Sequence, residues 1–373
     1  MRPASTFIIV FLCGDVMTGR GIDQILPHPS DPVLYEPAMK SAKGYVELAE
    51  DATGLIPKPV DFAYIWGDAL EELKRVAPDA RIINLETAVT RSTDWEDKGI
   101  NYRMSPDNVA CLTAAQIDCG VLANNHVLDW GTTGLVETVD TLRKARIKTA
   151  GAGRNRREAE APAVLEIEGK GRILVFAYGS ETSGVPWHWA ASERKPGVNL
   201  LTDFSDETVA HIKARVQDVK RPGDIVVVSL HWGGNWGYDS PPTQRKFAHQ
   251  LIDDAGVDVI HGHSSHHVRD IEVYKDKLIL YGCGDFLNDY EGIRGYEHYR
   301  GDLSLMYFAT MEPSTGNLVS LRMTPMQIKH FREQRASRAD ARWLRETLTR
   351  EGKKLGTRVE LEKDNTLTLR WGE

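Results

Sequence analysis

The sequence predicts an α/β fold for this chain of 373 residues. Several apolar runs of strand length show no alternation with polar residues, which is typical of strands buried on both faces. Segments with helical spacing of apolar residues lie between these runs. Polar residues follow many of the runs directly, as they do at the carboxyl ends of strands in open α/β sheets, where active sites form.

Composition restricts the class of protein. At 41% hydrophobic and 27% charged residues, the chain resembles an ordinary globular protein with one large core or two smaller ones. The net charge of −7, with no basic block, argues against nucleic acid or an anionic membrane surface as a partner. The apolar run 7–12 is too short to span a membrane and lacks a small-residue cleavage site. We therefore expect a cytoplasmic protein without a membrane anchor.

Four cysteines are present, and they form no CxxC pair. Three of them lie in or beside apolar segments. We expect buried free thiols, as in a reducing compartment.

In the first half of the chain, strands are expected where apolar runs end on polar residues, and helices where the apolar spacing is helical. The predicted strands are 7–13, 81–87 and 120–123. The predicted helices are 62–76, 106–117 with Ser105 as its cap, and a third from 132 or 133 to 146. Six prolines in 24–60 predict a long irregular loop beside the site.

The second half repeats the pattern. A hairpin is expected from 163–167 and 172–177, turned at Gly169-Lys170-Gly171, and an irregular insertion at 179–202 could wall a pocket. Predicted helices follow at 206–219 and 243–255, and predicted strands at 224–230, 256–260 and 277–283. The run 224–230 is the clearest strand of the chain, because β-branched residues dominate it.

The C-terminal part predicts two hairpins and a charged helix. The first hairpin comprises 303–310 and 318–326, the helix 338–350, and the last hairpin 357–362 and 366–371. We expect one integrated unit, in which residues 1–328 hold the chemistry and the extension 329–373 packs on that core as an edge. No internal repeat and no low-complexity linker divides the chain.

The segment 261–267 contains four of the twelve histidines. It follows a buried strand, and neutral imidazole is the commonest metal ligand in proteins. A solvated polar loop with incidental histidines is the alternative, which four histidines in seven residues make the weaker one.

Ligand-type residues also follow five other predicted strands. They are Asp15, Glu86, Asn125 with His126, His231, and Asp285. Each alone could be a helix cap or a turn residue. Together they form a mixed set of oxygen and nitrogen donors that suits Mn²⁺, Fe or Zn²⁺. The set is large enough for two ions about 3.5–4 Å apart that are bridged by a carboxylate. Such ions would lower the pKa of a bound water and convert it to hydroxide.

Six motifs of this sequence occur in the order found in the bacterial capsule-synthesis CapA family of poly-γ-glutamate synthesis, which the chain therefore resembles over about residues 7–310. That family in turn looks like a branch of the calcineurin-like metallophosphoesterases. The motifs are Gly14-Asp15-Val16-Met17-Thr18-Gly19-Arg20, Asn84-Leu85-Glu86, Ala123-Asn124-Asn125-His126-Val127-Leu128-Asp129-Trp130-Gly131, His231-Trp232-Gly233, Gly262-His263-Ser264-Ser265-His266 and Tyr281-Gly282-Cys283-Gly284-Asp285-Phe286. The first and third together are specific.

The resemblance implies a four-layer α/β/β/α sandwich with a dinuclear divalent-metal site. Carried over by motif, the implied ligands are Asp15, Glu86, Asn125, His231, His263 and His266. His126 would be a general acid or a transition-state donor, and Asp129 would orient its imidazole. Three residues are expected to contact an anionic substrate, with Arg20 binding its phosphate or carboxylate: Arg20, Asn124 and His267.

The sequence also departs from the family pattern. Met17 stands where metallophosphoesterases usually have a histidine, and Asp285 replaces the usual asparagine. The pair His263 and His266 is chosen because Glu272 then keeps its family spacing. His261 is left as a residue that supports the ligands. Many family members are anchored or extracellular, so a direct role in capsule anchoring is not expected here.

Three functions follow from these patterns. The first is a cytoplasmic metal-dependent hydrolase of a phosphoester, acting on a small-molecule or polymer-derived anionic substrate. The second is an amide or γ-glutamyl hydrolase or transferase on the same metals. The third is a non-catalytic assembly protein that keeps the fold. The oligomeric state stays open.

Overall fold

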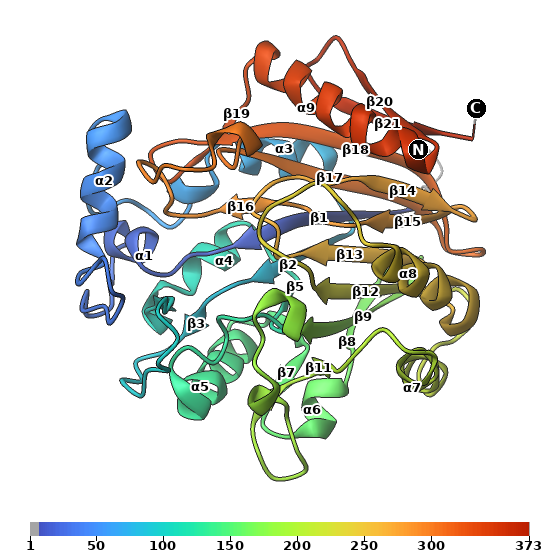
Figure 1. The fold of residues 1–373 in the computed structure, drawn as a ribbon, viewed down its shortest axis with the longest axis horizontal. Coiled ribbons are helices and arrows are strands. Elements are labelled where there is room, and N and C mark those ends of the chain that lie inside the picture. The colour runs from blue at the N-terminus through green and yellow to red at the C-terminus, as the bar shows by residue number, and fades with distance from the viewer. Residues whose placement is uncertain (1–6, 373) are drawn as a thin grey trace.

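Two β-sheets pack face to face in the computed structural model, which describes residues 7–372 (Figure 1). The larger sheet has the order β20-β21-β18-β17-β1-β2-β5-β6, with β16 beside β1 and β19 beside β18. Its strands are β1 (Ile8–Val16), β2 (Ala80–Leu85), β5 (Cys119–Val121), β6 (Lys148–Ala150), β16 (Asp285–Leu287), β17 (Leu303–Glu312), β18 (Asn317–Ile328), β19 (Glu333–Arg335), β20 (Thr357–Leu361) and β21 (Leu367–Trp371).

The smaller sheet has the order β11-β9-β12-β13-β15-β14, with β8 beside β9. Its strands are β8 (Ala163–Ile167), β9 (Gly171–Ser180), β11 (Leu200–Leu201), β12 (Ile225–His231), β13 (Val259–His263), β14 (Ile271–Tyr274) and β15 (Lys277–Leu280). The remaining described strands form two small sheets of two strands each. These are β3 (Ala88–Val89) with β4 (Arg103–Met104), and β7 (Ala152–Gly153) with β10 (Gly197–Val198).

One apolar layer lies between the sheets. It joins side chains of both, among them Val10, Leu12, Ile82, Val121, Val175, Val227, Val259 and Leu280. Fully burying one such aliphatic side chain is worth about 1.5–3 kcal/mol. This layer explains why the predicted strands are apolar without alternation, since the opposite face of each sheet is also covered.

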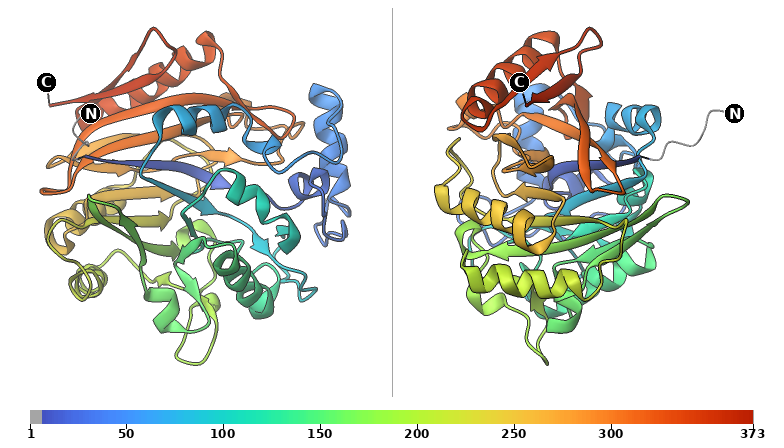
Figure 2. Two further views of the ribbon diagram at one scale, coloured as in Figure 1. Left: turned by 180° about the vertical axis from the view of Figure 1, so that it is seen from behind. Right: turned by 90° about the vertical axis from the view of Figure 1, so that its right-hand side faces the viewer.

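Helices cover the two outer faces (Figure 2). On the larger sheet lie α3 (Asp68–Val76), α4 (Ala110–Ala114) and α5 (Gly131–Lys144). Their Leu73, Leu112 and Leu135 pack with Phe11 and Ile83. On the smaller sheet lie α7 (Asp206–Gln217) and α8 (Pro242–Ala255), packed through Ile212, Phe247 and Leu251. The predicted four-layer α/β/β/α architecture is therefore confirmed.

The central strands of both sheets run parallel, so their carboxyl ends meet at one edge of the molecule (Figure 1). In the larger sheet Asp15 stands in register with Asn84 and with Asp285. In the smaller sheet His231 stands in register with His263. The topology thus gathers polar residues that are far apart in the sequence.

The close approach of β1 and β16 depends on two glycines. A Cβ on Gly14 would lie 1.6 Å from the carbonyl oxygen of Gly284, and Gly284 itself has φ +78°. The predicted strand 277–283 is shorter in the structure and ends at Leu280. Asp285 does not follow that strand directly but begins the separate strand β16.

The segment 24–60 differs from the prediction of an irregular loop. It contains α2 (Lys43–Thr53), whose Tyr45, Val46 and Ala49 are buried, and α1 (Gly21–Ile25) precedes it. The six prolines predicted an irregular segment, but all of them lie outside 38–56. The stretch between them contains no proline and is therefore free to form a helix.

Two predicted helices are shorter than expected. Helix 62–76 is divided by Gly67, with φ +45°, into a 3₁₀ turn and α3. Helix 106–117 is a 3₁₀ turn followed by α4, and Ser105 makes no side-chain cap bond within the described chain.

The C-terminal extension forms the predicted helix α9 (Arg338–Gly352) and the hairpin β20–β21. Strand β21 pairs with β18, and Leu344 and Leu348 of α9 join the layer between the sheets. The division of the chain after residue 328 stays a prediction. All four cysteines lie among the described residues and are free and buried. Within 7–372, none of the helices is long and apolar enough to cross a membrane.

Candidate metal centre

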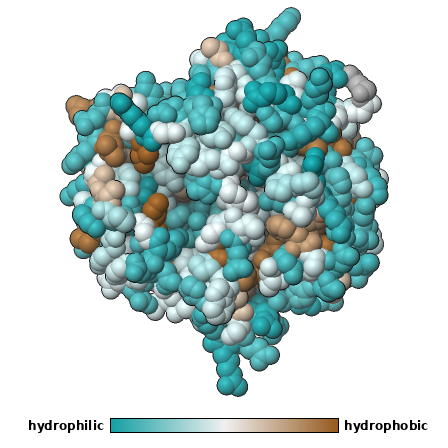
Figure 3. Space-filling model, in the orientation of Figure 1, coloured by the Kyte–Doolittle hydropathy of each residue, from teal (hydrophilic) through white to brown (hydrophobic). Residues whose placement is uncertain are grey.

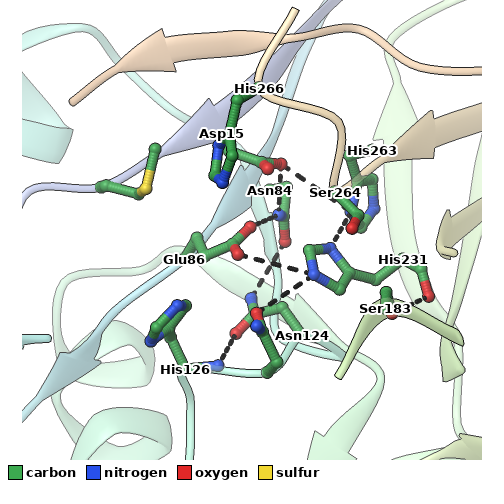
Figure 4. Close-up of polar contacts among 12 residues, drawn as sticks. Asp15, Asn84, Glu86, Asn124, His126, Ser183, His231, His263, Ser264 and His266 are labelled. Atoms are coloured by element: carbon green, nitrogen blue, oxygen red, sulfur yellow. Dashed lines mark hydrogen bonds and ion pairs between the residues drawn. The ribbon is translucent and has the colours of Figure 1, made fainter. Parts of the chain in front are cut away.

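Asp15, His231 and His263 converge where the two sheets meet (Figure 4). All three are buried, and one potential ligand atom of each lies within 4.8 Å of those of the other two. The Nδ1 atoms of His231 and His263 are 2.7 Å apart, and Nδ1 of His263 is 3.9 Å from Oδ1 of Asp15. This trio has the composition and spacing of a metal site.

The local sequence explains the convergence. The β-branched run before His231 forms β12, and Val259–His263 forms β13 in parallel register beside it. His261, two residues earlier on β13, is buried and bonds the carbonyl oxygen of Cys13 through Nε2 at 2.7 Å. That bond ties the smaller sheet to β1 just before Asp15, so His261 supports the site.

The three side chains fit a divalent cation. Within the described chain, Oδ2 of Asp15 is a buried oxygen with no hydrogen-bond partner. Burial raises the pKa of Asp15 to about 7, and burial lowers the pKa of His231 and of His263 well below the usual range. A bound cation would reverse the first effect and favour neutral imidazoles as ligands.

Glu86 and Asn125 extend the trio. Nε2 of His231 lies 3.5 Å from Oε1 of Glu86 and 3.2 Å from Oδ1 of Asn125. Asn84, the partner of Asp15 in the sheet, donates to Asp15 at 2.7 Å and to Glu86 at 2.6 Å. Burial and the neighbouring Asp15 raise the pKa of Glu86 well above its usual value. Five of the six predicted ligands thus lie around one point.

The sixth predicted ligand, His266, lies on the loop after β13, beside Asp15 (Figure 4). Its Nδ1 donates to Oδ1 of Asp285 at 2.9 Å, and Asn288 holds the other carboxylate oxygen at 2.8 Å. Burial acts to lower the pKa of His266, but the Asp285 carboxylate outweighs it and raises the pKa. This bond leaves Nε2 as the nitrogen available to a metal.

His126 stands apart from the ligand atoms (Figure 4). Its Nδ1 lies 2.7 Å from Oδ2 of Asp129. Burial, followed by the charge of Lys98, lowers the pKa of His126 to about 4. The backbone N–H of Tyr102 also donates to Asp129 at 2.6 Å, so the carboxylate is rigidly placed.

Lys98 is a residue of the site that sequence reasoning missed. Its Nζ donates to Asp129 at 2.8 Å and to the backbone oxygen of Asn125, and lies 3.4 Å from Nδ1 of His126. It lies in an irregular segment between β3 and β4, with no strand end or motif to mark it. Only the path of that segment brings it to the site.

The three expected substrate contacts are engaged with the protein itself. Arg20 is 3% exposed, and its guanidinium bonds Asp289 and Glu36. It also lies between the rings of Tyr45 and Tyr102, 3.9 and 4.2 Å from their centroids. Arg20 thus lies in a buried ion-pair network beside the site, and its contact with a substrate stays a prediction.

Asn124 and His267 are fully buried. Asn124 donates to Asn84 and to the backbone of Leu85, and accepts from the backbone of His126. His267 accepts from the backbone N–H of Gly237 at 3.1 Å and donates to a backbone oxygen. Both side chains are thus hydrogen-bonded within the protein, and their contacts with a substrate stay predictions.

The family model described as bacterial capsule synthesis protein PGA_cap matches residues 9–290. A probable polyglutamine synthesis accessory protein of Mycobacterium tuberculosis is 49% identical over 364 residues, which cover 97% of this chain and 96% of that protein.

The PGA biosynthesis protein CapA of Bacillus subtilis is 29% identical, covering 66% of this chain and 60% of that protein. The capsule biosynthesis protein CapA of Bacillus anthracis is 25% identical, covering 74% of this chain and 59% of that protein. Among solved structures, a novel phosphatase from Mycoplasma pneumoniae aligns with a TM-score of 0.47 and 11% identity, over 86% of this chain and 94% of that one.

Proposed function

The chain belongs to the bacterial capsule synthesis protein (PGA_cap) family, and on that premise we propose that it is a metal-dependent hydrolase that cleaves a phosphoester at a two-ion centre. The observation that supports this most is the convergence of Asp15, His231 and His263, with the unpartnered Oδ2 of Asp15 among them. A buried carboxylate oxygen without a partner is costly unless a cation meets it. The substrate would be a small or polymer-derived anion.

The residues that would hold two ions are Asp15, Glu86, Asn125, His231, His263 and His266. Mn²⁺, Fe or Zn²⁺ suits these donors, and the ions would supply Lewis acidity and a hydroxide nucleophile. Asn84 keeps the two carboxylates apart and oriented, because its amide donates to both. The bond between His266 and Asp285 fixes which ring nitrogen of His266 faces the ions.

His126 would act as a general acid that donates a proton to the leaving group of the substrate. Its hydrogen bond to Asp129 makes Nδ1 the nitrogen that carries a proton, so Nε2 is left to exchange a proton with the substrate oxygen. Lys98 and the Tyr102 backbone hold Asp129 in place, which keeps the imidazole in one orientation. An anionic substrate would favour the imidazolium form, against the effects of burial and Lys98 on its pKa.

Metal analysis and turnover of an aryl phosphate with Mn²⁺ test this proposal. We expect about two ions per chain in the wild type, and loss of both metal and activity in His231→Ala. His249→Ala is the matched control, since His249 contacts Glu272 and Tyr274 instead of the centre. A wild type without metal, together with unchanged activity in His231→Ala, would contradict the proposal.

A second candidate is an amide or γ-glutamyl hydrolase or transferase at the same centre. It is favoured by the names of the relatives, which concern polyglutamine and PGA synthesis. Turnover of γ-glutamyl peptides, measured beside phosphoesters on one metal-loaded preparation, discriminates the two. A non-catalytic assembly role, which the word accessory in a relative's name favours, instead requires weak metal affinity and a His126→Ala variant altered only in stability.

A further inference from the structure

A cavity of about 660 Å³ opens beside the metal centre. Arg20, His266 and Asn288 line its inner end. Aromatic and aliphatic side chains also line it, beside polar and charged ones; among them are Tyr45, Ile100, Trp236, Tyr290, Ile293 and Tyr296. In the space-filling view, hydrophobic residues gather on the side of the face where Figure 1 places α1 and α2, the latter carrying Tyr45 (Figure 3).

We propose that this cavity binds a planar aromatic group of the substrate, and that Tyr296 and Trp236 select it by stacking. This proposal rests on the proposed function, because it assigns the reacting group of the same molecule to the metal centre. His266 connects the two, since it lines the cavity and lies beside Asp15. The volume lies within the range of cavities that bind small organic ligands, about 300–1,000 Å³.

The stacking surface is already built. The rings of Tyr296 and Trp236 are parallel within 4°, with centroids 4.2 Å apart. The rings of His267 and Tyr299 also lie against Trp236, with their centroids 6.0 and 5.4 Å from its centroid. Tyr296 remains 51% exposed, although its ring is stacked on Trp236. A large aromatic ring held in place and left half exposed is the kind of surface that another planar ring covers.

Three of the charged groups that line the cavity are engaged by the protein itself. Arg20 is paired with Asp289 and Glu36, as described above. Arg300 is paired with Asp302 and Asp340. Glu291 accepts hydrogen bonds from Thr53 and from two backbone N–H groups. Because these three groups are engaged, we assign ligand binding to the aromatic faces, with Arg294, Glu297 and Lys329 as further charged residues of the lining.

Two pairs of ligands of equal size test the proposal. Benzyl phosphate and cyclohexylmethyl phosphate both have an alkyl leaving oxygen, but only the first has a planar ring. Benzylphosphonate and cyclohexylmethylphosphonate are the corresponding ligands that cannot be hydrolysed, so their dissociation constants are measured by calorimetry on the Mn²⁺-loaded protein. We expect the wild type to bind the benzyl ligand about three- to tenfold more tightly, the range of an aromatic pair beyond its apolar area.

Tyr296→Leu and Trp236→Leu should remove this preference and raise KM for benzyl phosphate. Tyr296 is half exposed, so its variant tests the proposal even if Trp236→Leu fails to fold. Trp187→Leu is the matched control, because Trp187 is 72% exposed and does not line the cavity. It should keep the preference.

The outcomes separate the two proposals. Equal affinity of the wild type for both phosphonates, or a preference that survives in Tyr296→Leu, overturns the aromatic site. A Tyr296-dependent preference for benzylphosphonate without turnover of either phosphate supports the aromatic site and counts against the hydrolase. Tighter binding of the cyclohexyl ligand would instead assign the cavity to a puckered or branched apolar group.

Discussion

Nδ1 of His266 donates a 2.9 Å hydrogen bond to Asp285, a carboxylate that lies beside Asp15 in the larger sheet. The bond joins the loop after β13 of one sheet to the start of β16 in the other. It therefore connects a proposed ligand from the smaller sheet to the sheet that carries Asp15. The relationship gives Asp285 a role that its place in the sequence left open.

Replacing Asp285 should weaken metal binding without removing a ligand. We expect Asp285→Ala to lower metal affinity by about 10–100-fold, the usual effect of losing the partner of a ligating histidine. Asp285→Asn should lose less, because its amide oxygen can still accept from Nδ1. Competition against a chromophoric chelator measures the affinity, with Asp253→Ala on the α8 surface as control. Unchanged affinity in Asp285→Ala would mean that His266 is not a ligand.

Removing the metal should lower the Tm of the wild type. In the metal-free protein, Asp15→Asn should raise the Tm again. At a metal concentration of 100 Kd, binding to the native state alone contributes about 2.7 kcal/mol. In metal-free protein, Asp15→Asn removes a buried carboxylate beside Glu86 and should raise Tm. Thermal unfolding with and without chelator checks both signs. A metal-free Asp15→Asn protein that melts below the metal-free wild type would contradict this account of the site.

Lys98 should affect catalysis through Asp129 and His126. We expect Lys98→Met to lower kcat by about tenfold or more with little change in KM, because Asp129 loses its ion-pair partner and the imidazole its fixed orientation. It should also raise the lower apparent pKa of the pH–rate profile, since the charge of Lys98 opposes protonation of His126. Lys98→Arg should recover part of the rate. An unchanged profile in Lys98→Met would show that Lys98 has no part in orienting the pair.

Glu333 should make the fold less stable at neutral pH than at acid pH. It is fully buried, its carboxylate contacts the Ser304 hydroxyl, and burial raises its pKa well above the usual value. A carboxyl group with a raised pKa in the folded state binds its proton more tightly there. The destabilisation is therefore absent below the unfolded pKa, near 4.3, and grows as the pH rises toward the folded pKa.

Glu333→Gln keeps the shape and removes the ionisation. At pH 7 we expect it to raise the free energy of unfolding by more than about 1 kcal/mol, the order of a tenfold change in proton affinity. At pH 4 the gain should vanish. Urea unfolding at the two pH values measures the difference, and Glu346→Gln on the exposed face of α9 is the control. Equal effects at both pH values would rule out ionisation as the cause.

Local patterns in the sequence were sufficient to predict the strands that carry the ligands. The run before His231 was predicted as the clearest buried strand, because β-branched residues dominate it without alternation. Polar residues directly after such strands were therefore expected at one edge of the fold. Helix α2 escaped prediction because flanking prolines dominated the pattern, while its apolar spacing is short.

The sequence by itself determined the α/β class, the strand ends and the residue types that gather there, because apolar periodicity and strand-end polarity are local properties of the chain. The four layers came from the resemblance to the family. Only the tertiary structure decided which partner each buried polar residue has. Arg20 belongs to the same motif as Asp15, and His267 directly follows the motif of His263, yet both are engaged by protein partners. Lys98 belongs to no motif, yet it reaches Asp129. The physical reason is that the role of a buried polar side chain depends on its hydrogen-bond or ion-pair partner. Here these partners lie many residues away in the sequence.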